Sequence, residues 1–160
     1  MTAISMSRRL LFGVGTSALA AVASIPAIAG LKPGNGSGLQ TEAIIRKHYK
    51  AWENKDWPTE NALLADNFTF SSAAGDARIS KSVFKTRCWD NNVNDIRRFD
   101  LLRLFPSGDE AFVLYNCVTM NNKNIRNVEY FQVRDGRITD LECYFGAPSN
   151  YPAAVSARGG

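Results

Sequence analysis

The segment at residues 125–145 carries the strongest folding signal in the chain. It reads I-R-N-V-E-Y-F-Q-V-R-D-G-R-I-T-D-L-E-C-Y-F, with two alternating runs on either side of Asp135-Gly136. An Asp-Gly pair between two such runs predicts a β-hairpin with a type I′ turn, because that turn requires positive φ at both central residues. The rest of the fold is therefore expected to assemble around an antiparallel hairpin.

Each arm of this hairpin presents one set of side chains to each face, because strand side chains alternate. The first arm collects Ile125, Asn127, Glu129, Phe131 and Val133 on one face, and the second arm offers Leu141, Cys143 and Phe145. A carboxylate is unusual on a face that is otherwise apolar or amide-bearing. If the face is buried, Glu129 is either a satisfied structural carboxylate or a working acid or base.

The first 29 residues have the layout of a secretory signal peptide. Arg8-Arg9 precede a short apolar run that ends at Ala27-Ile28-Ala29, and the paired arginines resemble a twin-arginine export signal. A membrane anchor is the alternative, but Pro26 interrupts the run. We expect cleavage, no stable membrane anchor afterwards, and export to the periplasm or the medium. A linker (30–38), a domain (39–147) and a flexible tail (148–160) are expected to follow.

The composition excludes several classes of function. A chain of 160 residues with 45% hydrophobic and 21% charged residues fits one globular domain with a real core. The net charge of +4, without a basic block or a Gly-rich phosphate loop, argues against nucleic acid or nucleotide partners. Cys88, Cys117 and Cys143 lack metal-ligand spacing and His48 is the only histidine, so no metal or cofactor is expected.

The predicted helices precede most of the predicted strands. Helices are predicted at Thr41–Asn54, from Trp57 to Leu64 and after Ser80. Strands are predicted at Asn67–Ser71, Ile96–Phe105 and Glu110–Met120. A loop is predicted over Asp90–Asp95. This order favours an α+β fold rather than alternating α/β. A curved sheet with helices on its concave side would enclose a pocket.

Three segments resemble the nuclear transport factor 2-like superfamily, the cone-shaped fold shared by ketosteroid isomerases and SnoaL-like polyketide cyclases. They are I-I-R-K-H-Y-K-A-W-E-N-K-D (44–56), L-A-D-N-F-T-F (64–70) and V-E-Y-F-Q-V-R-D-G-R-I-T-D-L-E-C-Y-F (128–145). The resemblance spans about Leu39 to Gly146. It implies three N-terminal helices on a curved, mainly antiparallel sheet, a pocket, and a homodimer formed through the outer sheet face. The fold hosts enzymes and non-catalytic binders alike.

The resemblance also implies roles for particular residues. In isomerases of this superfamily, a tyrosine of the first helix and an acid of the penultimate strand donate hydrogen bonds to the substrate oxygen. These positions fall on His48, with Tyr49 adjacent, and on Glu129. The general-base aspartate falls on Ser72, which is no carboxylate base, so that isomerase route is not expected. SnoaL-like cyclases rely on an acid in the sheet region, for which Glu129 is the candidate.

His48 and Glu129 are therefore the candidate catalytic residues. Imidazole titrates near neutrality and can give or take a proton, although a histidine in an apolar helix stripe can equally be a packed core residue. The hypothesis is that the two side chains form a proton-transfer or hydrogen-bonding pair on a carbonyl-bearing hydrophobic molecule. Asn116 and Asn127 are predicted on the face of Glu129, where they either orient a substrate or satisfy buried groups.

The remaining candidates are apolar or small side chains that form either core or pocket wall: Tyr49, Trp52, Ser72, Trp89, Leu114, Phe131, Leu141, Cys143 and Phe145. Cys117 is predicted on the face opposite Asn116, so a Cys117–Cys143 disulfide is not expected. A nucleophilic cysteine is not expected either, because a buried neutral thiol is the commoner state. The leading hypothesis is a metal-free isomerase, cyclase/lyase or hydratase. The alternative is a non-catalytic ligand-binding or dimerisation domain, and regulation of a partner through hydrophobic contact is a third.

Overall fold

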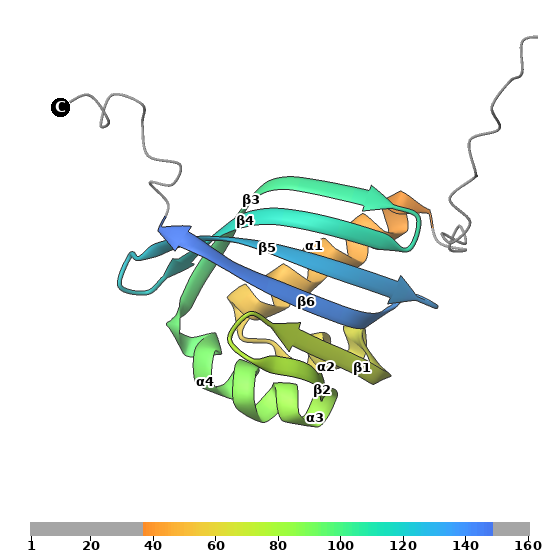
Figure 1. Ribbon diagram of the computed structural model, residues 1–160, viewed down its shortest axis with the longest axis horizontal. Helices are drawn as coiled ribbons and strands as arrows, with labels where there is room; N and C mark the ends of the chain where they lie inside the picture. The colour runs from red at the N-terminus through yellow and green to blue at the C-terminus, as the bar shows by residue number, and fades with distance from the viewer. Residues whose placement is uncertain (1–36, 149–160) are drawn as a thin grey trace, which may run out of the picture. The chain divides into compact units, whose positions relative to one another are not determined.

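The computed structural model of the chain describes residues 37–148 (Figure 1). The predicted signal peptide (1–29), the predicted linker up to residue 36, and the tail from residue 149 lie outside the described residues. None of the described helices is long and apolar enough to cross a membrane.

Two capped helices open the domain. α1 (Gly38–Asn54) begins earlier than predicted, because the side chain of Ser37 caps it by accepting a hydrogen bond from the Gln40 amide. α2 (Trp57–Leu63) begins where expected, with Asp56 accepting a hydrogen bond from the Thr59 amide as its N-cap. The short connection between these helices places α2 beside the C-terminal half of α1.

A third helical segment runs over residues 81–95. Ser80 caps α3 (Lys81–Phe84) as predicted, and the chain continues through the π-helical turn η1 (Lys85–Trp89), α4 (Asp90–Asn92) and the 3-10 turn η2 (Val93–Asp95). The prediction of a loop over Asp90–Asp95 is therefore wrong. The side-chain amides of Asn91 and Asn92 each donate to the carbonyl four residues earlier, so these polar residues support the helical turns.

The sheet contains six strands: β1 (Leu64–Ser72), β2 (Asp76–Ser80), β3 (Ile96–Ser107), β4 (Glu110–Thr119), β5 (Asn124–Arg134) and β6 (Arg137–Pro148). Their order is β2-β1-β6-β5-β4-β3, with β1 parallel to β6 and every other pair antiparallel. The β5–β6 hairpin is confirmed, with Asp135 at φ 50° and Gly136 at φ 75° in its turn. β2 was not predicted, because D-A-R-I-S is short and Ile79 is its only large apolar side chain.

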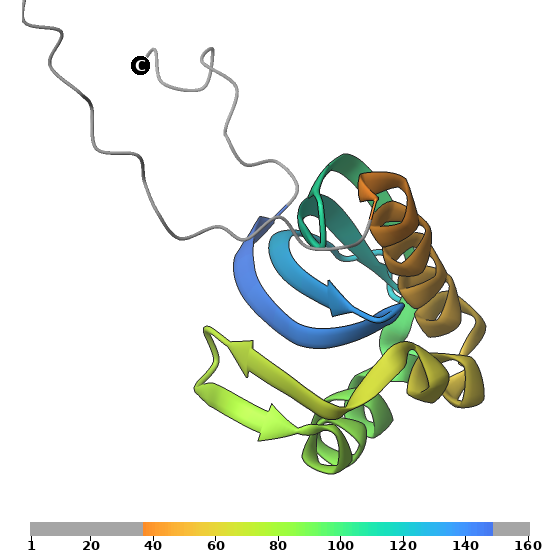
Figure 2. The same ribbon diagram turned by 90° about the vertical axis from the view of Figure 1, so that its right-hand side faces the viewer.

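The sheet curves around α1 (Figure 2). Helix α1 lies against its inner face, and the segment 81–95 lies on the β1–β2 side (Figures 1 and 2). Fully buried side chains such as Ile45 of α1, Val113 of β4 and Phe131 of β5 fill the space between helix and sheet. The predicted α+β architecture, with helices on a curved, mainly antiparallel sheet, is thus confirmed.

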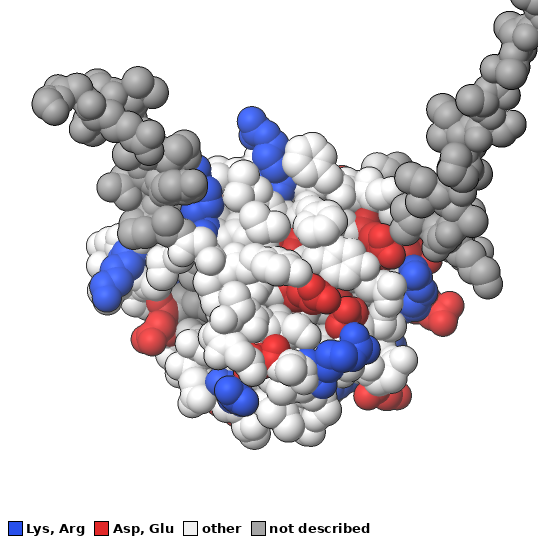
Figure 3. Space-filling model, viewed as in Figure 1, with Lys and Arg blue, Asp and Glu red and all other residues white. Residues whose placement is uncertain are grey.

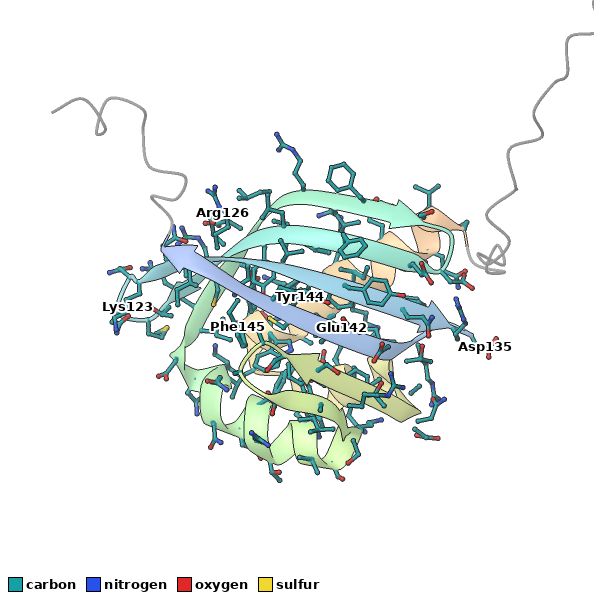
Figure 4. The ribbon with its side chains drawn as sticks, in the orientation of Figure 1. Lys123, Arg126, Asp135, Glu142, Tyr144 and Phe145 are labelled. Carbon is teal, nitrogen blue, oxygen red and sulfur yellow. The ribbon has the colours of Figure 1, made fainter. Side chains whose placement is uncertain are left out.

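The outer face of the sheet carries several large exposed side chains. Phe105, Phe112 and Tyr144 are each more than half exposed, and Figure 4 shows Tyr144 and Glu142 on β6. Uncharged side chains cover much of this face in Figure 3, with acidic side chains near its centre. Phe105, Phe112 and Tyr130 lie in one cross-strand row, so the outer face has an aromatic stripe.

Candidate functional site

A cavity of about 720 Å³ lies between α1, the segment 81–95 and the inner face of the sheet. Its apolar wall includes Trp52, Phe70, Phe84, Ile96, Phe99 and Leu141, and its polar groups include His48, Asp76, Arg87, Tyr115, Asn127 and Glu129. Phe145 and Arg87 are exposed, whereas His48 and Glu129 are buried. The cavity therefore runs from an accessible mouth to a buried polar end.

Glu129 is held at the buried end by two tyrosines. The Tyr49 hydroxyl donates to Glu129 Oε2 at 2.6 Å, and the Tyr115 hydroxyl donates to Oε1 at 2.9 Å. Asn127 Nδ2 in turn donates to the Tyr115 hydroxyl at 3.3 Å. Burial, followed by the charge of Glu129, raises the pKa of both tyrosines well above 10.0. Both hydroxyls therefore keep their protons and remain donors.

His48 has a different buried partner. Its Nδ1 lies 2.9 Å from Glu60 Oε1 and 3.1 Å from Oε2, and Glu60 of α2 is fully buried. Burial lowers the pKa of His48, but the charge and hydrogen bond of Glu60, with the charge of Glu129, more than offset that effect. The pKa of His48 is consequently raised above 6.5.

The structure brings His48 and Glu129 to one cavity, although it gives them separate partners. In the described part of the chain, the side chains of His48 and Glu129 are not hydrogen-bonded to each other. The neighbouring position, Tyr49, bonds to Glu129. Consecutive helix residues project about 100° apart, so His48 lines the cavity and meets Glu60, whereas Tyr49 meets Glu129 and does not line the cavity.

The predicted inward face of β4 is wrong. Leu114 and Asn116 were predicted beside Glu129, but the register pairs Val113 with Glu129 and Tyr115 with Asn127. Asn116 instead accepts a hydrogen bond from Arg126 Nε at 3.2 Å. The inward set of β4 therefore contains Tyr115, which the sequence analysis missed. Alternation could not reveal this, because F-V-L-Y-N-C places apolar residues on both faces.

Ser72 does not line the cavity and instead donates a hydrogen bond to Asp76 Oδ2 at 2.6 Å. Asp76 lines the cavity, and its Oδ1 is 3.1 Å from Arg87 Nε in an ion pair. Neither member of this pair is among the predicted site residues, because Asp76 lies on the unpredicted β2 and Arg87 on the helical turn η1. A second carboxylate therefore reaches the same cavity from β2.

The remaining predicted lining residues fall into two groups. Trp52, Asn127, Leu141, Cys143 and Phe145 line the cavity. Trp89 and Phe131 do not: Trp89 packs against Trp52 at 4.4 Å between ring centroids, and the Phe131 ring lies 5.3 Å from that of His48. These two side chains form the layer behind the cavity wall.

All three cysteines line the cavity as free thiols. The prediction that Cys117 points away from the face of Glu129 is wrong, because the register of β4 turns its odd-numbered residues inward. Cys117 and Cys143 are not joined by a disulfide, as expected. Burial raises the pKa of Cys88 and Cys117 to about 11 and that of Cys143 further. The thiols are therefore neutral near pH 7 and act as weakly polar wall.

Within residues 37–148, no three His, Cys, Asp or Glu side chains are grouped closely enough to ligate a metal ion. A second hollow of about 510 Å³ lies beside the β5–β6 turn and is lined by residues such as Asn67, Arg134 and Arg137. Glu129 and His48 do not line that hollow. The larger cavity is accordingly the candidate site.

Comparison with known proteins places the domain among related folds. The profile of the SnoaL-like domain matches residues 45–141. A search of curated proteins gives no match.

Three solved structures illustrate the shared fold. A protein of unknown function with a cystatin-like fold from Methylobium petroleophilum is 18% identical, with a TM-score of 0.61, and 74% of this chain and 84% of that chain are covered. A candidate ketosteroid isomerase from Kribbella flavida is 20% identical, with a TM-score of 0.58 and coverage of 72% and 88%. An LEH-like epoxide hydrolase from M. tuberculosis is 20% identical, with a TM-score of 0.55 and coverage of 67% and 83%. These identities show a common fold alone.

Proposed function

The chain belongs to the family of SnoaL-like domains, and on that basis we propose that it binds a small hydrophobic carbonyl-bearing molecule and catalyses proton transfer on it. The reaction would be of the isomerase, cyclase/lyase or hydratase type, with Glu129 and His48 as the proton-transfer groups. The observation that carries the proposal is the buried Glu129 carboxylate, which opens into a cavity while two tyrosine hydroxyls hold it.

The arrangement supports a specific proton path. A C–H bond next to the substrate carbonyl gives its proton to Glu129, and its electron pair moves into a carbon–carbon double bond. Negative charge then develops on the carbonyl oxygen, where a protonated His48 can donate a hydrogen bond. Glu129 returns the proton to another carbon for isomerisation. In an elimination, a leaving group departs from the neighbouring carbon instead.

The cavity wall supports the choice of ligand. Aromatic and aliphatic side chains dominate the wall, and a buried polar group of His48, Tyr115, Asn127 and Glu129 lies at one end. Arg87, Asn92 and Asp95 line its exposed part. Such a cavity favours a flat or aliphatic ligand with one polar group to be oriented. A volume of about 720 Å³ lies within the usual range for small-molecule sites.

A non-catalytic binding domain is the second candidate. Its support is that both Glu129 oxygens already accept tyrosine hydroxyls and that Ser72 occupies the position where the family's isomerases carry a base. In this case the same polar groups would only orient a ligand.

Export and dimerisation belong to the same proposal. The paired Arg8-Arg9 and the Ala27-Ile28-Ala29 end support export by a twin-arginine signal, with the domain working in the periplasm or outside the cell. The aromatic stripe, in which Phe105 and Phe112 are exposed and Tyr130 is half-buried, supports a homodimer through the outer face of the sheet.

The test is a screen of the mature protein against hydrophobic carbonyl-bearing metabolites by thermal shift and mass spectrometry. Glu129→Gln and His48→Ala are run beside wild type, with Glu142→Gln as the matched control on the outer face. Turnover by wild type and the control, together with binding but no turnover by the other two variants, would establish the enzyme. A ligand bound by wild type but never converted would favour the binding domain.

A further inference from the structure

Glu60 is the most deeply buried charged side chain of the described domain. Its exposed fraction is 0%, and its hydrogen-bonding contact is with His48 Nδ1. An isolated buried carboxylate is costly, and a single partner compensates it only when the geometry is good. A carboxylate kept in such a position therefore calls for a reason beyond packing.

The geometry indicates which partner donates. Both carboxylate oxygens lie close to the same nitrogen, at 2.9 and 3.1 Å. An N–H that points between two carboxylate oxygens produces this arrangement. An O–H donated from one oxygen to a bare nitrogen would instead favour one short contact. This arrangement fits Glu60 as the acceptor of a hydrogen bond from a protonated Nδ1 of His48.

The His48 ring also packs against aromatic rings of its own helix and of β5. The rings of Tyr49, Trp52 and Phe131 pack edge-on against it. Besides Glu60 of α2, the charged group that acts on it is Glu129 of β5. No described residue is hydrogen-bonded to Nε2, and His48 lines the cavity. Nε2 is thus the polar atom of the ring that remains for a ligand.

We propose that Glu60 is a positioning residue that fixes the proton of His48 on Nδ1 and thereby presents Nε2 to the cavity as the proton-exchanging atom. The role of Nε2 in catalysis rests on the proposed function, whereas the position of the proton on Nδ1 does not. In the imidazolium, Nε2–H donates to a developing oxyanion. In the neutral ring, Nε2 accepts a proton, and Glu60 stabilises the cation that results. Without Glu60, neutral imidazole could carry its single proton on either nitrogen.

The first test uses the full chain and needs no ligand. Because His48 is the only histidine, a long-range ¹H–¹⁵N correlation spectrum of labelled protein reports one imidazole. We expect the neutral ring to carry its proton on Nδ1 and the titration midpoint to lie above 6.5. A neutral ring with its proton on Nε2 would overturn the inference from wild-type protein alone.

Two variants separate the charge of Glu60 from its hydrogen bond. Glu60→Gln keeps an acceptor for Nδ1–H but removes the charge, so the midpoint should fall by about one pH unit or more while the tautomer is retained. Glu60→Met keeps the size but removes the acceptor, so the tautomer should shift towards Nε2–H. Glu42→Gln, on the exposed side of α1, is the control and should change neither. An unchanged midpoint in Glu60→Gln would refute the role of Glu60.

Kinetics with any substrate found in the screen distinguish this role from a structural ion pair between α1 and α2. For a positioning residue, the pH profile of kcat/KM of Glu60→Gln should move with the NMR midpoint. A structural pair would lower Tm and leave the profile in place, which would refute the inference while the proposed enzyme stands. If the spectra agree with the inference but no compound is turned over, the proposed function fails and the Glu60–His48 assignment remains.

Discussion

Removing the Tyr49 hydroxyl should destabilise the domain measurably. The hydroxyl donates to Glu129 Oε2 at 2.6 Å, and the two residues are 3% and 8% exposed. A hydrogen bond to a charged group contributes about 1.5–3 kcal/mol, and its loss leaves a buried oxygen short of a donor. We expect Tyr49→Phe to lower the free energy of unfolding by about 2 kcal/mol, or Tm by about 6–10 °C for a domain of this size.

The structure provides a closely matched control. The Tyr144 hydroxyl donates to Glu142 Oε2 at the same 2.6 Å, but on the exposed outer face of β6 (Figure 4). Tyr144→Phe makes the same chemical change in water and should leave Tm unchanged within error. Both variants are compared with wild type by urea unfolding followed by circular dichroism.

A double-mutant cycle tests the cause. In a Glu129→Gln background the partner is neutral, so Tyr49→Phe should cost only about 0.5–1 kcal/mol. The reasoning would be refuted if Tyr49→Phe cost no more than Tyr144→Phe, or if its cost were the same with Gln at position 129. Either result would mean that the buried carboxylate does not depend on this hydroxyl.

Two further predictions concern the sheet and the buried histidine. A Cβ added at Gly146 would overlap the backbone oxygen of Arg126, so Gly146→Ala should lower the free energy of unfolding, measured in urea, by about 2–4 kcal/mol. Gly38→Ala is the control, because the atom nearest to its added Cβ would be 3.5 Å away. Equal stability of the two variants would contradict the steric argument. Because the pKa of His48 is raised in the folded state, its stabilising contribution is fully present below about pH 6.5 and is lost as the pH rises through the folded-state pKa. The difference in free energy of unfolding between wild type and His48→Gln, measured by urea unfolding across pH, should therefore shrink above about pH 6.5. A difference that grows with pH would contradict a raised pKa of His48 in the folded state.

The hairpin could be predicted because its signals are local. Asp135-Gly136 sets the turn, which pairs Val133 with Ile138, and a bulge between Gln132 and Val133 then shifts the register so that Glu129 pairs with Cys143 and Phe131 with Leu141. The inward sets of β5 and β6 could be predicted from the alternation within each arm, whereas the bulge that brings the two sets together could not. β4 carries apolar residues on both faces, since its outer face presents Phe112 to the aromatic stripe, and alternation there has no unique solution.

The partners of the buried polar groups could not be predicted in the same way. Glu60 meets His48 because α2 folds back beside α1, and Tyr115 meets Glu129 because of the β4–β5 register. Both contacts depend on how whole elements pack. The sequence could reveal that a buried acid needs a partner, but it could not reveal which donor would reach that acid.

The register of α1 connects the two buried carboxylates. Consecutive residues of this helix, His48 and Tyr49, bond to Glu60 of α2 and Glu129 of β5, respectively. The two side chains point about 100° apart on a rigid helix, so a rotation of the helix about its axis would displace both contacts. Two buried networks therefore fix the rotation of α1 more tightly than apolar packing alone, which tolerates repacking. The position of His48 against the cavity is consequently determined jointly by Glu60 and Glu129, and a change at either carboxylate should be felt at the imidazole.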